Sequence, residues 1–293
     1  MNRKELDMKA LVVAKNNMGE FAWPTVLLAV VVVVGYFGTM LAVASQLLPL
    51  WLAVALTALF TYAAYTVLHE SVHGLIHGRY RSWRWLNNAL GYLAAFITMI
   101  PFTAHKHEHL VHHRHTNDID KDPDFKVSEM SGSFWNAIKT SKALVFNQYR
   151  FYLDNCWDRA CRADRARFVL EIAASLLVRL AFVMQGLWFE GFMLFIVGSG
   201  LGVITVVYLF AYIVHRPHSV KGRYLDTSTI TATGYLGKII TGLWLFQNYH
   251  SIHHLFPRVP FYKYTEVFNG IEEVMLLRGA PMYQLTPTGL KRF

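Results

Sequence analysis

A long apolar stretch without charge constrains the fold of this chain more than any other feature. From Phe21 to Leu68 the sequence contains no Asp, Glu, Lys, Arg or His, a run of 48 residues. One helix across a bilayer needs about 20 apolar residues, so the stretch predicts two spanning helices that turn near Gln46 to Pro49. Only 16% of the 293 residues are charged, against about a quarter in soluble domains. We therefore expect an integral membrane protein.

A second apolar region, Phe168 to Val214, predicts another helical hairpin. Glu171, Arg179 and Glu190 interrupt it, and its turn is expected near Trp188 to Gly191. The glycine run from Gly198 to Gly202 lies inside the predicted fourth helix with no strand before it, which favours close helix packing over a dinucleotide site. About four spanning helices in two hairpins are expected, and the segment from Ser82 to Thr103 is expected to lie at the membrane interface.

The basic residues predict the orientation of these helices. Lys and Arg flank the apolar regions, and neither expected external turn contains one. By the positive-inside rule, both termini and the long middle segment are cytoplasmic. His69 and His215 then lie at the inner ends of the second and fourth helices. The net charge of +9 is best explained by contact with anionic lipid, so no nucleic-acid partner is expected.

The fourteen histidines fall into a few tight groups. His69 and His73 are four residues apart, so a helix would present both on one face, with His77 one turn further along. Their segment also matches the H-E-x-x-H pattern, in which Glu70 would be the general base of a zinc protease. A single zinc site needs only about three protein ligands. The remaining groups exceed that number.

Two further segments repeat an H-x-x-H-H spacing, at His109 and again at His250. Histidines at i, i+3 and i+4 share one helical face. His105 lies one turn upstream on the same face, while His107 and His115 are less favourably placed. Imidazole suits iron, copper, zinc and nickel, so the ligand type does not name the metal. So many histidines at one membrane face favour a pair of ions that activates dioxygen over a hydrolytic site.

The order H-x-x-x-H, H-x-x-H-H and H-x-x-H-H, separated by apolar hairpins, resembles the membrane fatty acid desaturase and hydroxylase superfamily. The resemblance extends from about Thr66 to Tyr264. It implies two non-haem iron ions, with dioxygen as co-substrate. The implied ligands are His69, His73, His109, His112, His113, His250, His253 and His254, with His218 favoured as the ninth. Further ligands, or residues that orient the ligands, are expected among His77, His105, His215, Asp118 and Asp122.

The resemblance implies oxygen-dependent desaturation of an acyl chain in a membrane lipid. The H-R-P-H segment from His215 to His218 also resembles the carotenoid ring hydroxylases of the same superfamily, so carotenoid or other lipid hydroxylation is the alternative. An intramembrane zinc protease and a metal transporter or sensor are the candidates from other classes. Electrons are expected from a separate protein of the ferredoxin, rubredoxin or cytochrome b5 type with its reductase, docking on basic residues such as Arg159, Arg162 and Arg165.

The expected fold is an all-α integral membrane protein with a cytoplasmic helical cap that carries the histidines. We treat the chain as one domain, in a bacterial inner membrane. Its expected segments are a cytoplasmic N-terminus (1–20), a first hairpin (21–68), a cytoplasmic or interfacial segment (69–167), a second hairpin (168–214) and a cytoplasmic C-terminal segment (215–293).

Overall fold

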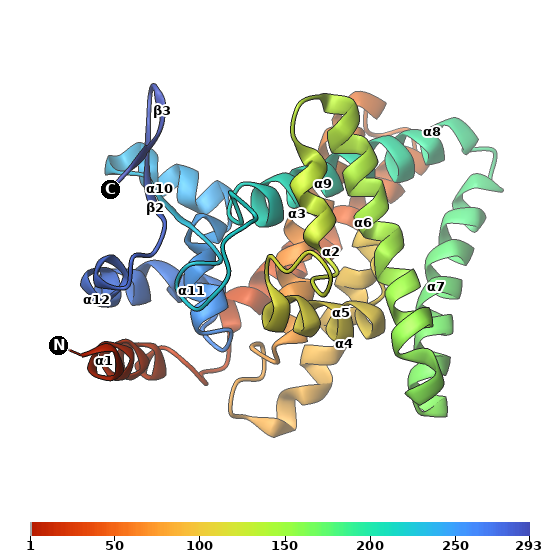
Figure 1. Ribbon diagram of the computed structural model, residues 1–293. Helices are drawn as coiled ribbons and strands as arrows, with labels where there is room; N and C mark the ends of the chain where they lie inside the picture. Colours follow the sequence, from red (N-terminus) through yellow and green to blue (C-terminus); the bar gives the residue numbers. More distant parts are fainter. Residues whose placement is uncertain (1) are drawn as a thin grey trace.

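The computed structural model describes residues 2–293 and is predominantly helical (Figure 1). The N-terminal half contains α1 (Arg3–Asn16), α2 (Trp23–Ala44), α3 (Leu50–Val72), α4 (Arg84–Thr98), α5 (Phe102–His115) and α6 (Phe134–Asn155). The C-terminal half contains α7 (Arg162–Val183), α8 (Trp188–Phe192), α9 (Ser199–Val206), β1 (Thr229–Thr231), α10 (Gly234–Leu243), α11 (His250–Leu255), α12 (Tyr264–Leu277), β2 (Met282–Thr286) and β3 (Gly289–Arg292).

Among residues 2–293, three helices are long and apolar enough to cross a membrane. The first two are α2 and α3, and the turn between them falls where the sequence predicts it, after Ala44 and before Leu50. The third runs from Trp188 to Tyr212 and joins α8 and α9 through π-helical turns. Helices α4 and α5 are bent by 93° and add a fourth candidate only if the bent pair is one span.

Helix α7, the expected first arm of the second hairpin, is not among these three. Glu171 and Arg179 interrupt its apolar sequence. Its turn to α8 occupies residues 184–187, earlier than expected, and Trp188 already begins the next helix. The outer side of α7 is nevertheless apolar and exposed, at Val169, Leu170, Leu176, Leu177 and Leu180.

The glycine run packs α9 closely against α3. A Cβ atom at Gly202 would lie 2.6 Å from the carbonyl oxygen of Ala58 and 2.7 Å from the Cβ of Thr61. At Gly198 it would lie 3.0 Å from Thr57 Cβ. Small residues allow helix backbones to approach in this way, as the sequence predicts. The contact fixes the third span against the helix that carries the first histidines.

The C-terminal cap packs α1, α11 and α12 around a second apolar core. A small three-stranded sheet belongs to this region, in the order β1-β2-β3 with β1–β2 parallel and β2–β3 antiparallel. Figure 1 labels β2 and β3 near the C-terminus. The all-α prediction misses this sheet. Thr229 in β1 hydrogen-bonds Ser251 in α11, and the Asn248 side chain donates to the Ile230 carbonyl at 2.9 Å. The sheet therefore anchors the helix that carries the last histidines.

Candidate metal centre

The first histidines lie at the end of α3. His69 is in the last turn of the helix and is buried, and His73 is its C-cap residue. The apolar face of α3 packs against α2, α4 and α9. The position of both imidazoles is therefore set by the membrane-embedded core.

The second histidine group comes from α5 and the third from α11 in the C-terminal cap. His109, His112 and His113 share one side of α5, and α11 begins at His250 and includes His253 and His254. The i, i+3 and i+4 spacing turns these rings toward the same interior. Segments far apart in the sequence thus meet at one place.

One group consists of five histidines whose nearest ring nitrogens all lie within 4.8 Å of one another. The Nε2 atoms of His109 and His73 are 3.1 Å apart, those of His113 and His109 are 3.0 Å apart, and those of His253 and His113 are 2.8 Å apart. His69 completes the group. We call these residues group A: His69, His73, His109, His113 and His253.

A second group lies directly beside the first. His112, His215 and His254 bring one ring nitrogen each within 4.8 Å of one another, and we call them group B. The His250 ring lies 5.1 Å from that of His215 and 4.8 Å from that of His254, between centroids. The two groups touch, since the ring centroids of His113 and His254 are only 4.4 Å apart.

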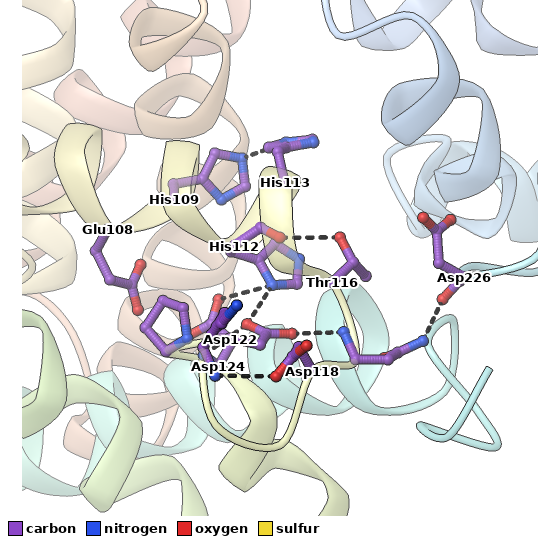
Figure 2. A network of polar contacts seen from close by, with 12 residues as sticks. Glu108, His109, His112, His113, Thr116, Asp118, Asp122, Asp124 and Asp226 are labelled. Atoms are coloured by element: carbon purple, nitrogen blue, oxygen red, sulfur yellow. Dashed lines mark hydrogen bonds and ion pairs between the residues drawn. The ribbon is translucent and has the colours of Figure 1, made fainter. Parts of the chain in front are cut away.

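Neighbouring side chains hold several of these rings through Nδ1. His112 donates to Asp122 at 2.8 Å and His250 donates to the Gln247 side-chain oxygen at 3.0 Å. The ring of His254 donates to the Thr116 hydroxyl at 3.3 Å, since that hydroxyl itself donates to a backbone carbonyl. A partner on Nδ1 fixes the ring and directs Nε2 elsewhere. Figure 2 shows His112 beside Asp122 and Asp124, with Glu108 pointing toward the same loop.

The donor set fits a pair of divalent metal ions. Both ring nitrogens of His69 and the Nε2 of His254 are buried without a hydrogen-bond partner, which is costly unless an ion or another group satisfies them. Burial lowers the pKa of His73 and of His250 to about 3. Neutral imidazole is the form that binds metal. Either group could hold one ion with three or more nitrogens.

The remaining expected residues lie outside the two groups. His218 stacks on the Tyr212 ring at 5.3 Å, and His77 hydrogen-bonds the Gly78 carbonyl through Nδ1. His105 binds Gln148 at 3.0 Å, and its ring centroid lies 5.2 Å from that of His109. Asp118 pairs with Lys221 at 2.8 Å near the surface.

Glu70 is placed as a structural residue. Its carboxylate accepts hydrogen bonds from the Phe261 backbone N–H at 3.2 Å and from the Thr25 hydroxyl at 3.3 Å. It therefore joins α2 to the cap. A zinc protease needs this carboxylate beside the metal-bound water, so the contacts of Glu70 count against that candidate.

Three contributors are not identified from the sequence as site residues. Gln247 and Tyr264 hold His250 and His253, the latter through a 3.1 Å contact between the Tyr264 hydroxyl and Nδ1. Thr116 holds His254. Each is close in the sequence to a histidine group, but hydrogen-bonding residues near a ligand are too common to be singled out without the fold.

Helices long enough to span a membrane and two adjoining histidine groups at the end of one of them are the features of an integral membrane protein whose histidines could hold metal ions. A fatty acid desaturase family model matches residues 45–286, and the chain therefore belongs to the fatty acid desaturase family. It is an oxidoreductase of lipid metabolism.

The curated proteins that are similar to this chain carry the names of desaturases. The chain is 24% identical to an sn-1 oleoyl-lipid 12-desaturase of Picosynechococcus sp., over 86% of this chain and 77% of the relative. It is 24% identical to a fatty acid desaturase of Bacillus subtilis, over 75% of this chain and 67% of the relative. It is 26% identical to an acyl-lipid (9+3)-(E)-desaturase of Dimorphotheca sinuata, over 71% of this chain and 62% of the relative.

Proposed function

We propose that this protein introduces a double bond into an acyl chain of a membrane lipid, using dioxygen at two iron ions held by nine histidines. The observation that carries the proposal is the contact between groups A and B, which would place two ions side by side at the inner end of a membrane span. We propose His215 as the ninth ligand in place of His218, because His215 belongs to group B.

The histidines and their partners perform the protein's share of the chemistry. Iron bound there would supply dioxygen activation and the removal of hydrogen from an unactivated C–H bond. Asp122, Gln247 and Thr116 hold three rings in fixed orientations. Preorganised ligands keep both ions close without reorganisation during turnover.

A small, mostly apolar pocket lies beside the metal centre, where part of the substrate would bind. It is lined by Tyr65, Phe210, Val206 and His105 among others. The Tyr65 ring lies 6.0 Å from that of His69, between centroids. The part of an acyl chain that reaches this pocket would meet mostly hydrocarbon and aromatic surface, with Asp124 and Gln148 as polar neighbours. Such a lining excludes water and suits a reaction at an unactivated carbon.

A separate donor must supply electrons, and we propose where it docks. A polar cleft of about 320 Å³ is lined by His113 and His254, by the cations Arg114, Lys221 and Arg223, and by the acids Asp118 and Asp226. Because the three cations outnumber the two acids, an acidic redox protein is favoured. Arg159, one of the expected docking residues, lines a different cleft beside His107. We also propose the orientation that the basic residues predict, with this face in the cytoplasm.

Hydroxylation of a lipid or a carotenoid would use the same histidines, so only the product distinguishes hydroxylation from desaturation.

The identity of the metal is tested on protein purified in lipid nanodiscs. About two irons per chain are expected, one for each histidine group, together with oxygen uptake that requires both lipid and electron donor. One zinc per chain without oxygen uptake would exclude the proposal and favour the zinc protease as the function instead.

A further inference from the structure

A second cavity lies on the outer side of the elbow between α4 and α5. Its volume is about 390 Å³, within the range of roughly 300–1,000 Å³ that is typical of ligand pockets. Its walls come from α2, α4, α6 and α7, and include Phe37, Leu93, Phe96, Leu170 and Ala174. Nearly all of this lining is hydrocarbon or aromatic ring. The cavity is therefore suited to an alkyl chain.

The mouth of this cavity is continuous with surface that faces lipid. Leu93 on α4 and Leu170 on α7 line it and are themselves exposed. Next to them, Leu176, Leu177 and Leu180 continue an exposed apolar surface along α7. In a protein with spanning helices, a leucine surface of this kind is covered by the bilayer. Lipid chains are thus the molecules at the entrance.

One end of the cavity carries a guanidinium group. Arg167 lines it, is exposed and pairs with Asp164 at 2.7 Å through one nitrogen, Nη1. Glu171 also lines the cavity, but its carboxylate is directed to the start of α5, where it accepts hydrogen bonds from the backbone of Phe102 and Thr103. Arg167 pairs with Asp164 through Nη1, so its Nη2 and Nε can donate to a phosphate. A guanidinium above an apolar cleft matches a phosphate above an acyl chain.

Residues 98–101 and one turn of α6 lie between this cavity and the pocket beside the metal centre. Met99 and Pro101 line the outer cavity, while Thr98 and Ile100 line the inner pocket. Helix α6 shows the same division, because Tyr149 lines the outer cavity and Gln148 the inner pocket. The Tyr149 hydroxyl donates to the Met99 carbonyl at 2.6 Å and secures this wall.

We propose that the outer cavity is a binding site for one acyl chain of a membrane glycerophospholipid, with Arg167 at the lipid phosphate. The inner pocket has a volume of only about 50 Å³, too small for a whole chain. The outer cavity holds the chain next to it, separated by residues 98–101. As a site for the substrate lipid, the inference rests on the proposed function, whereas lipid binding itself does not.

The test uses protein in nanodiscs that contain a phosphatidylglycerol with a photoreactive diazirine in its acyl chain. Crosslinks are expected on Leu93, Met99 and the cavity side of α7. Ala174→Trp fills the mouth and is expected to lower crosslinking at Met99 about tenfold, equivalent to about 1.4 kcal/mol. Arg167→Gln is expected to lower it about two- to fivefold, as for loss of an exposed ion pair. Leu176→Trp is the matched control and is expected to change nothing, because Leu176 is exposed, does not line the cavity and points about 160° away from Ala174 around α7.

Equal crosslinking along all exposed faces of α2 and α7, unaffected by Ala174→Trp, would overturn the proposal. Arg167→Gln keeps the inference testable if the tryptophan variant does not fold. The crosslink does not require turnover, so His253→Ala is expected to keep it while losing activity. If the wild-type protein crosslinks at Met99 but never desaturates a lipid, the lipid-binding site is supported and the proposed function is excluded.

Discussion

Asp122 accepts a 2.8 Å hydrogen bond from the Nδ1 of His112, at the junction between the loop after α5 and the metal centre. The same carboxylate accepts the backbone N–H groups of Asn117 and Asp124. The ring is buried, which disfavours its charge, but the nearby carboxylates of Asp122, Asp124 and Asp226 together outweigh burial and raise the pKa of His112 to about 9. An ion on Nε2 must therefore displace a proton from this ring. Asp122 thus ties one ligand of group B to the fold of a loop.

Asp122→Ala is therefore expected to lower iron content and turnover together. Loss of a residue that orients a ligand typically costs about 10–100-fold in metal affinity or activity. Iron per chain and the desaturation rate are the measurements. Asp118→Ala removes a neighbouring carboxylate that pairs with Lys221 near the surface, and it is expected to keep nearly full iron. Equal losses in both variants would mean that the loop as a whole matters, and not the bond to His112.

Opposite effects on iron content are expected for alanine variants of His215 and His218. His215→Ala removes a group B nitrogen, and one of the two irons is expected to be lost with nearly all activity. His218→Ala removes a ring stacked on Tyr212, and partial activity with full iron is expected. Iron analysis of the two purified variants decides between them. The reverse result would restore His218 as the ninth ligand.

Glu70→Gln tests the role of the first carboxylate. The glutamine oxygen can still accept the Phe261 N–H, so we expect iron to be retained and activity to fall less than tenfold. Glu70→Ala leaves that buried donor without a partner, which costs about 1–3 kcal/mol. A lower melting temperature of the alanine variant is the expected sign. Complete loss of activity in the glutamine variant, with iron retained, would instead indicate a catalytic carboxylate.

Docking of the electron donor is tested by comparing two basic surfaces. Lys221→Gln with Arg223→Gln is expected to raise the KM for an acidic donor about fivefold at low salt, with kcat unchanged, because rim charges act mainly on encounter. The difference is expected to fade as salt screens it. Arg159→Gln with Arg162→Gln is the comparison pair. A larger effect from that pair would move the docking site to the cleft beside His107.

The sequence predicts those parts of the site that depend on helical spacing. Histidines at i, i+3 and i+4 must share a face once α5 and α11 form, and the uncharged stretch must become a hairpin. The choice between His215 and His218 follows instead from the irregular turn after Tyr212, which no periodicity describes. The sheet escapes prediction because β1 is three residues long and is stabilised by pairing with β2, over fifty residues away.

The lipid product of the reaction tests the proposed desaturation most directly. Lipids are extracted from aerobic cells of a host that makes both acyl lipids and carotenoids, with and without this protein, and compared by mass spectrometry beside His253→Ala. Acyl chains that have lost two hydrogens are expected, only with the wild-type protein. Gain of oxygen on acyl chains or pigments, or no change in any lipid, would contradict it.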